Sequence, residues 1–81
     1  MATKIEELTL ANLGKGCLGK AASDEPVFIL RAHDETAPAT IRYWAQKARA
    51  FGSPLEKVHE ALNLADEMEA WQNIHGSKFP D

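Results

Sequence analysis

The sequence predicts a small, mainly α-helical domain: three helices, two of them in a helical hairpin, and one short extended segment. Three observations predict this fold. Apolar residues recur at helical spacing in three stretches, a Gly-Ser-Pro junction separates the last two, and only one short run is rich in β-branched and aromatic residues. With 81 residues, the chain has the length of one domain, so residues 1–81 are expected to form a single unit.

Residues 4–13 are expected to form the first helix. Thr3 and Glu6 have the spacing of a capping box, which satisfies backbone N–H groups at a helix start. Apolar residues then recur at helical spacing. Three glycines follow within six residues, and each costs a helix about 1 kcal/mol relative to alanine. The helix therefore ends there, and the structure of residues 14–21 stays open.

Residues 27–32 form the candidate extended segment. The run Val-Phe-Ile-Leu suits a buried strand, but a run this short also fits a short helix that begins at Pro26. The sequence contains no second strong strand, so a strand here needs a partner. Val27, Phe28 and Ile29 are therefore candidate self-association residues, which would pair with the same segment of a second chain.

Residues 37–51 are expected to form the second helix. Pro38 belongs in its first turn, and either Asp34 or Thr36 caps it. One face of this helix is apolar and another is charged, as in a helix that packs on one side. The apolar positions are Ile41, Trp44, Ala45, Ala48 and Phe51.

The most specific local signal joins the last two helices. Gly52 stands where a residue with a left-handed backbone ends a helix. Ser53 and Pro54 then have the pattern of an N-cap serine and a first-turn proline, and Glu56 follows as the acidic third residue. Residues 54–72 are expected to form the third helix. Because the connection is so short, the two helices must either reverse direction or turn sharply, and they must pack together.

The third helix has a wide apolar arc made of two rows. The first row is Leu55, Val58, Leu62 and Ala65, and the second is Ala61, Leu64, Met68 and Trp71. One partner helix covers one row, so two explanations stay open. Either the first and second helices both pack here, or the second row meets another chain, which makes Leu64, Met68 and Trp71 candidate self-association residues. Residues 73–81 are expected to form a flexible tail.

No group of residues supports catalysis, so an enzyme is not expected. Residues 14–20 share the glycines and lysine of a phosphate-binding loop, but Ala21 replaces the Ser or Thr that holds magnesium. The three histidines lack the spacing of a helical metal site. Cys17, alone in an apolar row, is typical of buried packing. We therefore expect no catalytic residue, no cofactor and no metal site.

A helix-turn-helix DNA-binding unit is the alternative interpretation of the last two helices. Ala48, Gly52 and Val58 stand where such units carry a small residue, a turn glycine and a packed β-branched residue. The third helix would, however, present Glu56 and Glu60 to the phosphates, and the net charge is −3. Both features oppose DNA binding, so nucleic acid is not an expected partner.

One segment carries a resemblance: Asp-Glu-Pro-Val-Phe-Ile-Leu-Arg-Ala at residues 24–32, followed by Ala-Pro at 37–38 and Trp-Ala at 44–45. It resembles small uncharacterised proteins of bacteriophages and prophages over about residues 20–70. The resemblance carries no activity, ligand or catalytic residue. It implies a phage-type accessory protein that acts by binding in a bacterial cytoplasm.

The location expected from the residues themselves is also the cytoplasm. The first ten residues contain charges where a signal peptide needs an apolar run. No stretch approaches the about 20 apolar residues of a membrane span, so no membrane partner is expected. The single cysteine cannot form an intrachain disulfide, which fits a reducing compartment.

The function that these observations predict is binding to another protein. We expect a small non-enzymatic accessory protein, such as a phage-encoded inhibitor of a host protein, that also forms a homo-oligomer. Charged side chains on the last two helices are candidate contacts, because charge governs association rate and specificity. These candidate interaction residues are Arg42, Arg49, Glu56, Glu60, Asp66 and Glu67.

Overall fold

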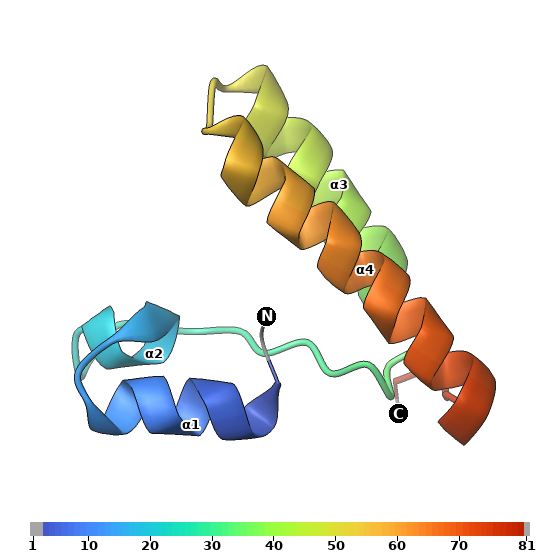
Figure 1. Ribbon diagram of the computed structural model, residues 1–81, viewed down its shortest axis with the longest axis horizontal. Helices are drawn as coiled ribbons and strands as arrows, with labels where there is room; N and C mark the ends of the chain where they lie inside the picture. The colour runs from blue at the N-terminus through green and yellow to red at the C-terminus, as the bar shows by residue number, and fades with distance from the viewer. Residues whose placement is uncertain (1–2, 81) are drawn as a thin grey trace.

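The computed structural model describes residues 3–80 and is mainly α-helical (Figure 1). Its helices are α1 (Lys4–Asn12), α2 (Gly16–Lys20), α3 (Ala37–Ala50) and α4 (Leu55–His75). These described residues form no β-sheet. The predicted mainly α fold with a helical hairpin is therefore confirmed, and the three predicted helices correspond to α1, α3 and α4. None of the described helices is both long enough and apolar enough to cross a membrane.

Helices α1 and α2 form a small unit at the N-terminal end of the chain. The Thr3 side-chain oxygen accepts a hydrogen bond from the Glu6 backbone N–H at 3.2 Å, and the Thr3 hydroxyl donates to the Glu6 carboxylate at 2.9 Å. The predicted helix start is therefore confirmed. Helix α2 occupies the stretch that the sequence left open. It folds back closely because Gly19 has no side chain: a Cβ there would lie 2.7 Å from the carbonyl carbon of Gly14.

An extended linker joins this unit to α3. Residues 25–31 have no regular secondary structure and cross the molecule as an extended trace (Figure 1). The run at 27–30 is therefore neither a helix nor a strand of a sheet. Within residues 3–80, its backbone N–H and C=O groups make no hydrogen bond. This is the consequence of a strand-like run in a chain that supplies no second strand to pair with it.

Helices α3 and α4 form an antiparallel hairpin with a tight turn (Figure 1). Gly52 has a φ of 85°. Its N–H donates to the Arg49 carbonyl at 3.1 Å, and the Ser53 N–H donates to the Ala48 carbonyl at 2.9 Å. These two bonds make up the Schellman motif that ends many helices, so the left-handed glycine is confirmed.

The predicted role of Ser53 as the N-cap of α4 is wrong. The cap residue is Pro54, α4 begins at Leu55, and no side chain caps this end. Ser53 is instead the last residue of the turn that closes α3. The Pro54 carbonyl accepts from the backbone of Lys57 at 3.0 Å, so the backbone alone makes the first turn of α4.

This turn gives a first prediction. Gly52→Val should destabilise the protein by about 1–2 kcal/mol, because an L-residue resists a left-handed backbone and a β-branched one resists it most. Ser53→Ala is the matched control and should change the free energy of unfolding by less than about 0.5 kcal/mol, since no cap bond is lost. Urea unfolding followed by circular dichroism measures both. Equal midpoints for the two variants would contradict the turn described above.

The core of the hairpin is narrow and built from small residues. The buried hydrophobic side chains are Ala37, Ala45, Val58, Ala65 and Met68, and Pro38 is buried with them. The buried line on α4 takes residues from both predicted rows, because the line that faces α3 lies between them. Among the residues that the structure describes, no large side chain is fully buried.

Two expectations about the apolar arc of α4 are corrected. Met68 is only 9% exposed, so it packs inside the hairpin and is not part of a surface open to a second chain. Helix α1 does not pack on α4, because the described helices pack only as the pairs α1–α2 and α3–α4. The explanation in which two helices of the same chain cover both rows is therefore wrong.

The C-terminal segment is held more firmly than predicted. Helix α4 continues to His75, and residues 76–80 follow it. The Lys78 N–H donates to the His33 carbonyl at 3.0 Å, and the Glu35 N–H donates to the Lys78 carbonyl at 2.9 Å. This short parallel bridge ties the end of the chain to the start of α3, so residues 73–78 are not a flexible tail. The last residue of that predicted tail lies outside the described residues.

Candidate interaction surfaces

One face of the α3–α4 hairpin carries large apolar side chains that remain exposed. Trp44 is 53% exposed and Phe51 is 86% exposed. Successive helical residues turn by about 100°, which places these aromatic side chains and their apolar neighbours on one side of the buried line. We call this surface the aromatic face. It consists of Ile41, Trp44, Ala48 and Phe51 from α3 and of Ala61, Leu64 and Trp71 from α4.

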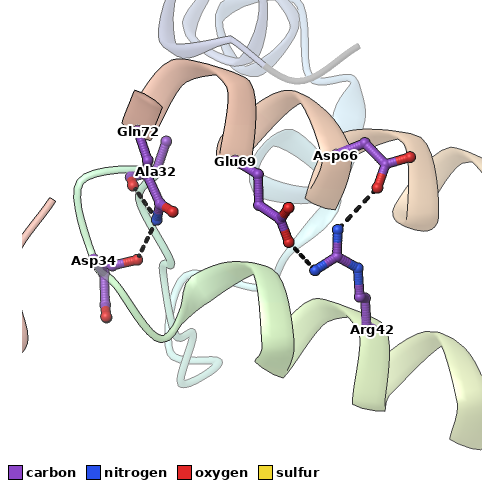
Figure 2. A network of polar contacts seen from close by, with 6 residues as sticks. All are labelled: Ala32, Asp34, Arg42, Asp66, Glu69 and Gln72. Atoms are coloured by element: carbon purple, nitrogen blue, oxygen red, sulfur yellow. Dashed lines mark hydrogen bonds and ion pairs between the residues drawn. The ribbon is translucent and has the colours of Figure 1, made fainter. Parts of the chain in front are cut away.

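The opposite face of the hairpin is marked by an ion-pair network around Arg42 (Figure 2). The Arg42 guanidinium donates from Nη1 to Glu69 Oε1 and from Nη2 to Asp66 Oδ1, the latter at 2.8 Å. The hydrogen bond that Arg42 donates to Glu69, and after it the one that it donates to Asp66, hold the pKa of Arg42 above its ordinary value. These bonds join α3 to α4. They show that the side of α3 with Arg42 and the side of α4 with Asp66 and Glu69 belong to the same face of the hairpin.

The ion pairs change the interpretation of two predicted contact residues. Arg42 and Asp66 were expected to offer separate charges to a partner, but they bind each other. Sequence reasoning missed Glu69, which lies three residues after Asp66 on the same side of α4. That spacing was the signal that could have found it.

The other predicted contact residues are exposed but do not form one cluster. Glu56, Glu60 and Glu67 lie along α4 on the side turned away from α3, as their helical positions require. Arg49 is exposed on α3, on the same flank as Arg42. The acidic residues of α4 therefore border the aromatic face, whereas Arg49 does not.

A part-buried polar anchor holds the linker against α4 (Figure 2). The Gln72 side-chain amide donates from Nε2 to the Ala32 carbonyl at 2.9 Å and to the Asp34 carbonyl at 3.0 Å. Sequence reasoning did not identify Gln72. Its position seven residues after Ala65 places this polar side chain on the buried line of α4, and a polar residue there indicates a backbone partner.

Asp34 starts the turn that leads into α3. Its Oδ1 accepts hydrogen bonds from the Thr36 N–H at 2.8 Å and from the Thr36 hydroxyl at 2.7 Å. Both bonds lower the pKa of the Asp34 carboxyl from its ordinary value, and the bond from the Thr36 hydroxyl has the larger effect. Of the two predicted caps, Thr36 is the N-cap residue of α3, although its side chain makes no cap bond. Asp34 does not cap the helix itself but accepts from Thr36 in the turn before it.

The extended linker presents the second apolar surface. Phe28 is 86% exposed, and Val27 and Ile29 are also exposed on either side of it. Their backbone groups are unpaired within residues 3–80, as described above. This segment therefore offers both apolar side chains and free hydrogen-bonding groups to another molecule.

The residues considered for chemistry do not assemble a site. Cys17 is exposed, so the prediction that it is buried is wrong. His33 and His75 instead flank Trp71: the His75 ring stacks on the indole at 4.3 Å between centroids, and the His33 ring meets it edge-on at 6.5 Å. Across the described part of the chain, no three His, Cys, Asp or Glu side chains gather as metal ligands would.

The total surface is large for a chain of this mass. A folded monomer of 8.9 kDa is expected to expose about 4,800 Å², whereas this chain exposes 6481 Å². The radius of gyration, 13.5 Å, likewise exceeds the about 12 Å expected for a compact domain of this length. The chain alone therefore leaves apolar surface uncovered that a single compact domain would bury.

Comparison with known proteins returns no match. No protein-family model, no curated protein and no solved structure matches this chain.

Proposed function

We propose that this chain is a non-enzymatic accessory protein that binds another protein through residues 27–30 of its linker. The observation that supports this most is the combination of exposed apolar side chains, with Phe28 at 86% exposure, and unpaired backbone groups in one extended segment. Each unpaired backbone group can form a hydrogen bond with a partner strand. A segment with both features is suited to add as a strand to the edge of a partner's β-sheet.

The chemistry of the segment matches this mode of binding. In a strand, successive side chains point to opposite sides, so Val27 and Ile29 would enter one apolar surface of the partner and Phe28 the other. Pro26 has no N–H and limits the pairing at its end. The helical units on both sides are separate from each other, so the segment between them is accessible to a sheet edge.

The resemblance to phage and prophage proteins suggests the setting for this function. An accessory protein of that kind would act on a host protein in the bacterial cytoplasm, and covering a sheet edge is one way to inhibit such a protein. The acidic side chains on the outer side of α4 would then steer association toward a basic surface. These charges are Glu56, Glu60 and Glu67.

The geometry and charge of the hairpin oppose the alternative of DNA binding. A helix-turn-helix unit holds its two helices at about 90–120°, whereas α3 and α4 lie antiparallel along their lengths (Figure 1). The exposed glutamates of α4 and the net charge of −3 also oppose contact with phosphates. We therefore propose protein binding alone.

The test of this proposal is capture of proteins from a bacterial lysate by the immobilised full-length chain. Phe28→Asp should abolish retention of a partner, because it places a charge where an apolar pocket is expected. Ile29→Pro and Leu30→Pro keep the chain extended but remove N–H groups on opposite edges of the segment, so at least one of them should weaken retention.

Phe79→Asp is the matched control, since Phe79 is also a largely exposed phenylalanine, at 70%, and lies outside the linker. It should retain the partner as the parent does. A partner that binds all four variants equally would contradict binding through the linker, and so would the absence of any protein that the parent retains.

A further inference from the structure

We propose that the aromatic face of the hairpin binds a second copy of this chain, so that two hairpins form a four-helix assembly. This inference goes beyond the proposed function, which uses residues 27–30 and not the hairpin. The aromatic face is the site, and the occupant is the same face of another copy, related by a two-fold axis.

The first argument is the surface that the chain leaves uncovered. Its exposed area is greater by roughly 1,700 Å² than that expected for a folded monomer. This excess belongs to the whole chain, including the linker and the α1–α2 unit. It is about twice the 800 Å² that a standard interface buries on each partner, so the uncovered surface is large enough for a dimer. The hairpin also needs the contact, because its own core is limited to small and medium side chains.

The second argument is shape. The ion pairs of Arg42 with Asp66 and Glu69 show that the middle of α3 lies level with residues 66–69 of α4. Trp44 is therefore level with Leu64, and Phe51 is level with the first turns of α4. If α3 of one copy lies against α4 of the other, the aromatic side chains of α3 meet the smaller side chains around Ala61. Large residues then face small ones, as close packing requires.

The third argument is charge at the borders of the aromatic face. Lys47 lies on the outer border of α3, and Glu60 and Glu67 lie on the outer border of α4. The same arrangement, with α3 against α4 of the other copy, brings opposite charges together at both borders. The alternative arrangement, with α3 against α3 and α4 against α4, would place the two Lys47 side chains along one border and the glutamates of both copies along the other, so each border would carry like charges. Charge complementarity therefore favours the first arrangement.

The test is sedimentation equilibrium of the full-length protein from low to high micromolar concentration. The parent should have twice the chain mass, and Trp44→Glu should raise the dimer dissociation constant by about 30-fold or more, as loss of a central aromatic residue does. Leu55→Glu is the matched control, because Leu55 is similarly exposed, at 57%, but lies on α4 outside the aromatic face. It should leave the dissociation constant unchanged.

Two further variants test the arrangement and guard against loss of folding. Lys47→Glu and Glu60→Lys should each weaken the dimer by about tenfold, and the double variant should restore it, because only the double variant again pairs opposite charges. Helicity measured by circular dichroism should stay at the parent level in all of them. Restoration by the double variant cannot result from unfolding.

The outcomes separate this inference from the proposed function. A parent that stays monomeric at high micromolar concentration, or a dimer that Trp44→Glu leaves intact, would overturn it, as would assembly beyond two copies. A dimer that the charge-swapped double variant does not restore would overturn the proposed arrangement. Phe28→Asp should form the dimer normally, so a failure of partner capture leaves this result unaffected.

Discussion

Replacing Met68 with glutamate is expected to unfold the α3–α4 hairpin. Met68 is 9% exposed and lies in a thin core, in which most of the buried hydrophobic side chains among the described residues are alanines. A carboxylate there would be buried without a partner, at a cost of about 3–5 kcal/mol. A domain of this length has a total stability of about 4–12 kcal/mol, and a thin core places this one toward the lower end. The charge therefore removes most or all of the stability.

Circular dichroism and sedimentation together measure this effect. The helical signal of Met68→Glu should fall at room temperature, and the protein should not persist as a folded monomer. Ile74→Glu is the matched control, because Ile74 is an exposed apolar residue on the same helix and should tolerate the charge. A folded, fully helical Met68→Glu monomer would show that Met68 faces another chain and not the inside of the hairpin.

Replacing Ala65 with leucine is expected to have the second largest effect. Ala65 is fully buried, and Ala45 on the facing helix is only 1% exposed. Small residues at these positions allow the two helices to approach closely. Added methylene groups in a well-packed core cost about 1–3 kcal/mol, and a two-helix core has few other side chains that can move to make room. We expect about 3 kcal/mol.

Urea unfolding quantifies this loss. Ala70→Leu is the control, because Ala70 is exposed on the same helix and leucine has nearly the helix propensity of alanine. Its unfolding midpoint should match that of the parent, while the midpoint of Ala65→Leu falls. If both variants unfold like the parent, the helices do not meet at Ala65.

Much of the fold could be predicted because its signals are local. Thr3 and Glu6 mark the start of α1 through hydrogen bonds within one turn. Gly52 marks the end of α3 because a left-handed backbone at that position favours glycine. Ser53 shows the limit of such signals, because the pattern that ends α3 and the pattern that starts α4 overlap at this residue. In the structure Ser53 takes part in the turn that ends α3 and does not cap α4.

The candidate surfaces were predicted in part. The exposure of Val27, Phe28 and Ile29 follows from an apolar run without a second strand, which is visible in the sequence. The partners of Arg42 were not predicted, because they lie more than 20 residues away on another helix. Gln72 was missed for the same reason, since its hydrogen-bond acceptors are backbone carbonyls of the linker.

The sequence by itself determined the helices α1, α3 and α4, the turn between α3 and α4, and the apolar character of the linker. Each of these depends on residues within a few positions of one another, through hydrogen bonds, backbone preference or periodicity. Only the tertiary structure decided which side of each helix is buried. The line on α4 that faces α3 lies between the two apolar rows, so Met68 packs inside while Trp44 and Phe51 stay exposed on the aromatic face. That choice depends on how two helices meet, which local spacing cannot specify.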